Sequence, residues 1–87
     1  MKKELYENFI IKLKSKFSDN KIVNEFILDA EELAKYGEMR IALENLLTNL
    51  IDNEIAISKE LVSLAEEAFG YNPGDYDKQL IMEIKQF

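Results

Sequence analysis

The stretch Glu38-Met-Arg-Ile-Ala-Leu-Glu-Asn-Leu-Leu-Thr-Asn-Leu-Ile51 decides the fold class. Its apolar residues recur at spacings of three and four, which is the period of one buried stripe along an α-helix. The stripe consists of Met39, Ala42, Leu43, Leu46, Leu47 and Leu50. A helix with a single apolar face needs other elements to cover it, so this stretch predicts a packed helical fold.

The same period occurs on both sides of this stretch. We expect further helices over residues 3–17, from about residue 20 to 36, and over 59–69, because turn and cap residues separate these segments. The separators are Ser18, Asp19 and Asn20, then Gly37, then Ser58, and finally Gly70. Ile55 and Ile57 lie in a short extended link and are expected to cover one end of the bundle.

The tail, residues 76–87, fits two structures. A helix capped by Asp75 would bury Tyr76, Leu80, Ile84 and Phe87, whereas a short strand would bury Leu80, Met82 and Ile84. We favour the helix, because no other segment predicts a strand that could pair with it. The prediction is therefore an all-α fold, a compact bundle of four to five short helices forming one domain over residues 1–87.

The composition excludes most enzyme chemistry. The chain has 87 residues with no His and no Cys, so a zinc site, a thiol nucleophile or an imidazole base cannot be built. Asp75-Tyr76-Asp77 begins like a calcium-binding loop, but Leu80 stands where that loop needs its Gly. We predict that the protein is not an enzyme, with no catalytic residues, no cofactor and no bound metal.

The longest apolar runs, Phe9-Ile10-Ile11 and Phe26-Ile27-Leu28, are far shorter than the roughly 20 residues that cross a bilayer. The start of the chain also lacks the apolar core of a signal peptide, because Glu4, Glu7 and Asn8 interrupt it. We expect a cytoplasmic protein that does not interact with membranes.

Charge is unevenly distributed. Residues 1–21 carry six Lys and three acidic side chains, while the rest of the chain carries five basic and fourteen acidic ones, about −9 in net charge. A body with that field repels nucleic acid and attracts basic partners. We therefore expect no nucleic-acid binding.

Two acidic groups are candidates for a partner-binding surface. The expected helix over 20–36 places Glu25, Asp29 and Glu32 together, opposite its apolar stripe. The second group lies around the helix over 38–51 and comprises Glu38, Glu44, Asp52 and Glu54, with Ile41 on the same flank. Two interpretations stay open for each group: the carboxylates form a solvated face or a partner surface, and Ile41 packs in the core or is an exposed anchor.

The stretch Ala34-Lys-Tyr-Gly-Glu-Met-Arg-Ile-Ala-Leu-Glu-Asn-Leu46, with the link through Ile55 and Ile57 to Ser58, resembles the small MafI-type immunity proteins. The likeness covers roughly residues 20–70. It implies a helical, cytoplasmic protein that binds and inactivates a cognate bacterial toxin domain of contact-dependent growth inhibition, frequently a nuclease. The chain has Leu47 and Ile51 where family members often have a Cys and an aromatic residue, so toxin identity and contact residues do not carry over.

Charge and resemblance together predict an immunity protein that neutralises a basic toxin domain through its acidic surface, because a nuclease site that holds phosphates is basic. Tyr36 and Tyr71 are candidate anchors beside the carboxylates. The alternative is a non-enzymatic adaptor that binds a partner helix in an apolar groove. Whether free chains also form a weak homodimer stays open.

Overall fold

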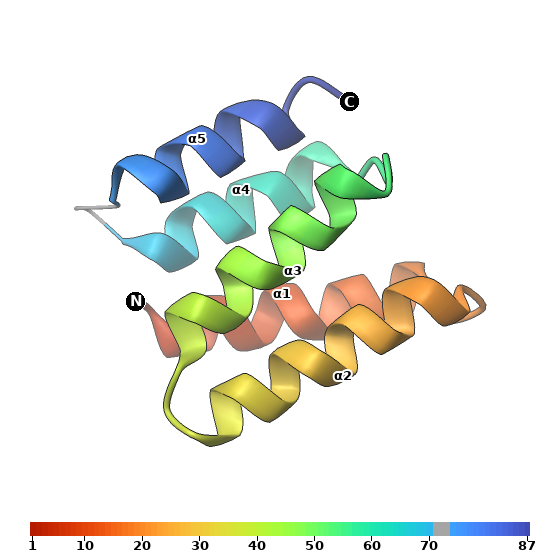
Figure 1. Ribbon diagram of the computed structural model, residues 1–87, viewed down its shortest axis with the longest axis horizontal. Helices are drawn as coiled ribbons and strands as arrows, with labels where there is room; N and C mark the ends of the chain where they lie inside the picture. The colour runs from red at the N-terminus through yellow and green to blue at the C-terminus, as the bar shows by residue number, and fades with distance from the viewer. Residues whose placement is uncertain (71–73) are drawn as a thin grey trace.

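A computed structural model describes residues 1–70 and 74–87. The described residues form five α-helices and no strand, which confirms the predicted all-α class and favours the helix over the strand for the tail (Figure 1). The helices are α1 (Lys3–Lys16), α2 (Lys21–Lys35), α3 (Met39–Asp52), α4 (Lys59–Phe69) and α5 (Asp75–Ile84).

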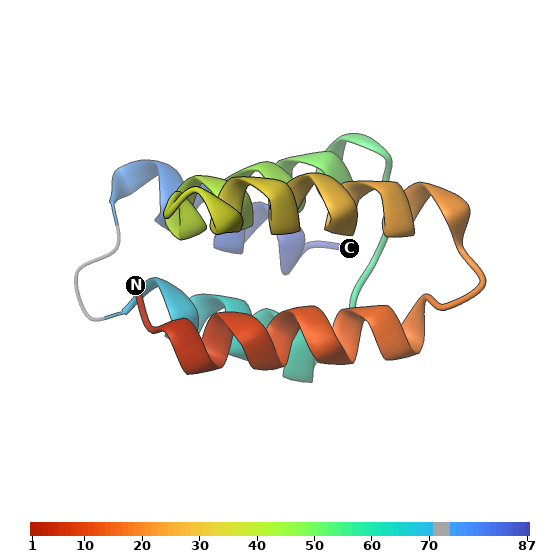
Figure 2. The ribbon, with the colours of Figure 1, turned by 90° about the horizontal axis from the view of Figure 1, so that it is seen from below.

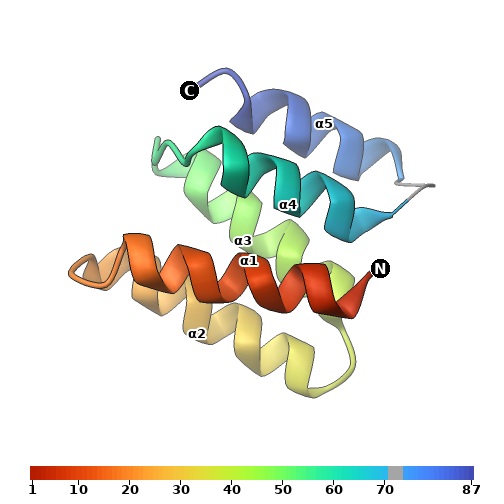
Figure 3. The same ribbon diagram turned by 180° about the vertical axis from the view of Figure 1, so that it is seen from behind.

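The helices pack in two layers. Figure 2 shows α1 and α4 in one layer and α2, α3 and α5 in the other, with the link between α3 and α4 crossing from layer to layer. The thinnest dimension of the molecule is 19 Å, as expected for two helices packed face to face. Neighbours within a layer are not always neighbours in sequence: α1 packs mainly on α4, seen side by side in Figure 3, while α2 packs on α3.

Helix α3 lies at the centre of the core. It contacts α2 and α5 in its own layer and α1 in the other. Its predicted stripe is fully buried apart from Met39, which packs partly buried at the edge of the core. The fully buried residues of α3 are Ala42, Leu43, Leu46, Leu47 and Leu50.

The predicted caps are present. Asn20, one of the three candidates, accepts a hydrogen bond from the Val23 N–H at 3.1 Å, and Ser58 accepts one from the Leu61 N–H at 3.2 Å. Gly37 ends α2 with a φ of 82°, a left-handed conformation that costs Gly little.

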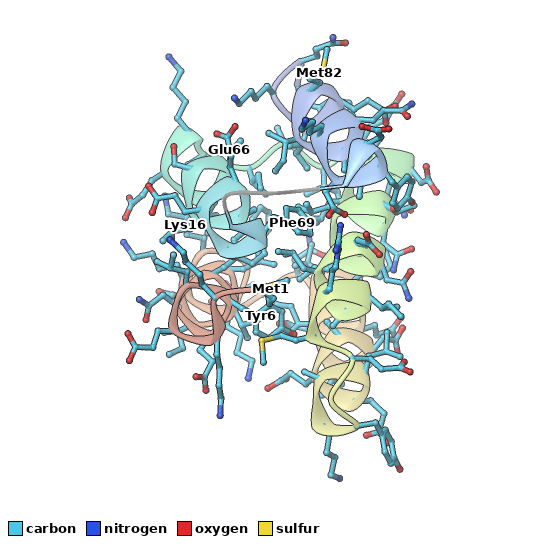
Figure 4. The ribbon with its side chains drawn as sticks, turned by 90° about the vertical axis from the view of Figure 1, so that its left-hand side faces the viewer. Met1, Tyr6, Lys16, Glu66, Phe69 and Met82 are labelled. Atoms are coloured by element: carbon cyan, nitrogen blue, oxygen red, sulfur yellow. The ribbon has the colours of Figure 1, made fainter. Side chains whose placement is uncertain are left out.

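The two layers meet over large side chains. Tyr6 of α1 and Phe69 of α4 point toward the opposite layer in Figure 4. The Tyr6 hydroxyl donates to the Ala30 carbonyl of α2 at 3.4 Å, and burial, assisted by the Glu31 charge, raises the pKa of Tyr6 to about 12. The phenol therefore stays neutral and can donate this bond throughout the physiological range.

The predicted buried face of the tail was partly wrong. Leu80 and Ile84 are buried as expected, but Tyr76 and Phe87 are about half exposed, and Asp77 is buried in place of Tyr76. The helix also begins at Asp75, with Gly74 rather than Asp75 as its N-cap residue. The reason is electrostatic: Asp77 finds Arg40 of α3 as an ion-pair partner, so α5 turns its carboxylate inward.

A substitution of Leu46 tests the central position of α3. Leu46→Ala removes a fully buried side chain and should lower the free energy of unfolding by about 2–5 kcal/mol. Leu28→Ala on α2 is the matched control, because Leu28 is 65% exposed, and should change it by less than about 0.5 kcal/mol. Urea denaturation followed by circular dichroism measures both, and equal losses in the two variants would contradict the assignment of the core.

Candidate protein-binding surface

The outer side of α2 carries the first predicted acidic group. Glu25, Asp29 and Glu32 are all exposed, and their spacings of four and three place them along one face, as predicted. Large apolar side chains accompany them: Leu28 is 65% exposed and Tyr36 is 75% exposed. Ile22, at the start of the helix, is exposed as well. We call these six residues the α2 face.

The carboxylates of the α2 face are among the acidic side chains that take no part in the ion pairs of the described residues. In residues 1–70 and 74–87, Glu25, Asp29 and Glu32 form no ion pair. Five other carboxylates do form ion pairs within the chain: Glu31, Glu44, Glu60, Glu66 and Asp77. The negative charge of the α2 face is therefore left for solvent or a partner.

The acidic residues of the second predicted group, around α3, do not all lie together in the structure. Glu38 and Asp52 are exposed at the two ends of α3, and Ile41 is 45% exposed, so it is not a core residue. Helix α3 lies beside α2 in the same layer (Figure 1). The exposed residues of α3 therefore add to the exposed surface of that layer.

Glu54 occupies an unusual backbone position just after α3. Its φ is +55°, and the Ile55 N–H donates to the Leu50 carbonyl at 2.9 Å, which is the hydrogen bond of a Schellman helix end. Gly is the usual residue there, because a side chain costs roughly 1–2 kcal/mol in the left-handed region. Glu54 is exposed, so its carboxylate is available at the end of the α3 surface.

Glu44 belongs to a different site. Its side chain is only 19% exposed and lies 3.7 Å from the Arg40 Nε, measured from its Oε2. Arg40 also pairs through Nη2 with Asp77 of α5, whose Oδ2 accepts a second hydrogen bond, 3.1 Å long, from the Gly74 N–H. Arg40, Glu44 and Asp77 form what we call the α3–α5 cluster.

The cluster shifts the pKa values of both carboxyls. The hydrogen bond that Glu44 can donate to Asp77 when protonated, partial desolvation and the Asp77 charge outweigh Arg40 and raise the pKa of Glu44 to about 7. Burial alone would raise the pKa of Asp77, but hydrogen bonds from protonated Glu44, from Gly74 and from Arg40, together with the Arg40 charge, bring it below the ordinary value. The pair therefore carries less negative charge near neutral pH than two ordinary carboxylates.

Arg40 and Asp77 were not among the site residues predicted from the sequence. Two signals were present: Arg40 is the single arginine in the chain, and Asp77 stands three residues after Gly74, where a carboxylate can bond to the N-cap N–H. Neither signal shows which carboxylate meets the arginine, since that depends on how α5 packs on α3.

The remaining predictions concern Tyr71, a bound metal and membrane spanning. Tyr71, the second predicted anchor, lies outside the described residues. Among the described residues, no cluster of three or more acidic side chains is placed to hold a metal ion, and no helix combines the length and apolar character needed to cross a membrane.

A shallow groove of about 350 Å³ runs between α1 and α2. Its apolar lining includes Tyr6, Ile10, Ile11, Ala34 and Met39, and charged side chains from both helices border it. This groove is the feature on which the adaptor alternative depends.

Comparison of the chain with protein-family models, with curated protein sequences and with solved structures finds no match.

Removing Arg40 tests the α3–α5 cluster. Arg40→Met keeps most of the aliphatic stem but leaves Asp77 buried without its counter-charge, so the free energy of unfolding should fall by about 3 kcal/mol. Lys85→Met is the control, because Lys85 and Glu66 form an exposed pair at 3.4 Å whose loss should cost less than about 1 kcal/mol. Urea denaturation at pH 6 compares the two, and the cluster has no structural role if both variants match the wild type.

Proposed function

We propose that the protein is an immunity protein that binds a cognate toxin domain, a basic nuclease, through the α2 face. The observation that carries this proposal is the row of three exposed carboxylates on one face of α2, which have no ion-pair partner among residues 1–70 and 74–87 and lie alongside Leu28 and Tyr36. The resemblance of residues 20–70 to MafI-type immunity proteins supports the toxin as the partner.

The electrostatics fit an inhibitor of a phosphate-binding protein. Adjacent carboxylates on one helix face repel each other and cost a few tenths of a kcal/mol per close pair, a cost that a lysine among them would remove. A basic partner would replace that repulsion with attraction and would be steered toward the face during diffusion. We expect the carboxylates to govern the association rate.

Exposed apolar side chains would hold the complex together once formed. Tyr36 and Leu28 lie at the edges of the acidic row, and Ile41 is a comparable exposed side chain on the neighbouring helix α3. Large side chains of this kind dominate the dissociation rate when a partner pocket covers them. Tyr36 is the strongest candidate, because it combines the largest exposure with a ring and a hydroxyl.

Charge reversal on α2 tests the proposal. The variant Glu25→Lys/Asp29→Lys/Glu32→Lys should slow association with the toxin domain encoded by the neighbouring reading frame by at least about tenfold at low salt. The control Glu4→Lys/Glu7→Lys/Glu67→Lys makes the same change in net charge on exposed positions of α1 and α4. The variants are compared by stopped-flow association rates between 25 and 500 mM NaCl and by rescue of cells that express the toxin. Equal slowing of association in both variants would contradict the assignment of the α2 face as the binding surface.

Truncation of Tyr36 tests the anchor. Tyr36→Ala should leave the association rate within about twofold of the wild type and raise the dissociation rate by roughly thirtyfold or more, the equivalent of a 2 kcal/mol hot spot. The control Tyr76→Phe removes only a hydroxyl that hydrogen-bonds to Thr48 within the chain. Surface plasmon resonance separates the two rates, and an unchanged dissociation rate in Tyr36→Ala would remove Tyr36 from the interface.

The groove between α1 and α2 favours a second candidate function, an adaptor that takes an apolar partner helix. The two candidates respond differently to salt. Steering onto a basic toxin slows steeply as ionic strength rises, whereas apolar docking in the groove barely responds. Ile11→Asp in the groove would abolish helix docking and leave toxin association through the α2 face unchanged.

A further inference from the structure

Within residues 1–70 and 74–87, one oxygen of the fully buried Asp77 carboxylate finds no hydrogen-bond donor. Oδ2 accepts from Arg40 and from the Gly74 N–H, whereas Oδ1 has no partner in this part of the chain. A buried acceptor without a donor destabilises the fold, and more strongly when it is charged. The neighbouring group is the Glu44 carboxyl, which shares the Arg40 guanidinium with Asp77. When it is ionised it can only accept hydrogen bonds, and when it is protonated it has an O–H to donate.

We propose that Glu44 and Asp77 form a proton-binding site at the contact between α3 and α5, in which protonated Glu44 donates a hydrogen bond to the buried Asp77 carboxylate. Arg40 then neutralises the one remaining negative charge of the pair. When the proton leaves, two carboxylates compete for a single guanidinium that is itself half exposed. The loss weakens the docking of α5 on α3. This inference is independent of the proposed toxin binding.

The charged groups around the pair come from three helices. Helix α3 contributes Arg40, and α5 contributes Lys78 and Lys85, with Asp75 and Tyr76 at its start. Helix α4 contributes Glu66, which pairs with Lys85. Glu66 and Asp77 both line a second groove, between α4 and α5. Only Arg40 forms an ion pair with either carboxyl in the described chain, so the proton on Glu44 and the Arg40 charge together balance the pair.

The absence of His makes this site the expected pH-sensitive element near neutrality. Histidine is the side chain that ordinarily titrates between pH 5 and 8, and the chain has neither His nor Cys. The Glu44 pKa of about 7 falls in that window because of its hydrogen bond to Asp77, its burial and the Asp77 charge. The N-terminal amine is the same in all the variants compared below, so it cannot account for a difference between them.

The direction of the pH effect follows from linkage. Because the pKa of Glu44 is raised on folding from 4.5 to about 7, the folded chain holds a proton that the unfolded chain releases between these values. The stabilisation that Glu44 contributes is therefore full at low pH and is lost as pH rises through 7. Between pH 5.5 and 8 the folding equilibrium constant should fall on the order of thirtyfold.

Carboxyl-detected ¹³C NMR on the wild-type protein gives the first test. The Glu44 side-chain carbon should titrate with a midpoint near pH 7, well above the ordinary range of a glutamate carboxyl. A Glu44 midpoint within that ordinary range overturns the proposal. This measurement needs no variant, so it decides even if a substitution fails to fold.

Glu44→Gln gives the second test, because its amide supplies a permanent N–H donor to Asp77 at every pH. Urea denaturation of this variant should lose most of the thirtyfold change between pH 5.5 and 8. Glu66→Gln is the matched control and should keep the wild-type profile, since Glu66 is exposed and pairs with Lys85. A wild-type slope in Glu44→Gln would show that another group binds the proton.

Discussion

Burial of one face of α3 is the constraint on which the other helices depend. Its stripe of Ala42, Leu43, Leu46, Leu47 and Leu50 is closed off by α2 on one side, by α5 on the other and by the opposite layer underneath. Helices of ten or eleven residues, such as α5 and α4, are marginal in water when isolated. Helix α5 persists because the central helix offers it apolar surface to cover, and α4 is held mainly by its packing on α1.

Periodicity and caps predicted most of this arrangement. The segment 38–51 differs from the observed α3 by one residue at each end, and Asn20, Gly37 and Ser58 act at the helix ends where their side chains or backbone freedom suggested. These predictions succeeded because spacing and capping are local properties of the chain.

The predictions that were wrong concern the environments of polar residues that lie far apart in the sequence. Tyr76 was expected inside, yet Asp77 is buried in its place, next to a counter-charge 37 residues earlier on Arg40. Glu44 was placed with the surface carboxylates, and the structure instead brings it against Asp77. Apolar patterning cannot foresee such pairs, since one ionic contact decides which face of a short helix turns inward.

The chain uses its acidic residues in two ways. Some, such as Glu31 and Glu60, pair with lysines of the basic first helix, so they tie α2 and α4 to α1. In the described part of the chain, Glu25, Asp29 and Glu32 of the α2 face have no such partner. Their negative charge is therefore left for solvent or a partner protein.

The pairing of α1 with α4 has a consequence for the order in which the chain acquires its structure. Helices α2 and α3 are consecutive and meet after a turn of a few residues, whereas α1 must wait for a partner more than 40 residues downstream. During synthesis on the ribosome, the apolar side of α1, including Phe9 and Leu13, therefore emerges well before α4 can cover it. The lysine-rich character of this first helix counters self-association through that interval, because like charges keep nascent chains apart.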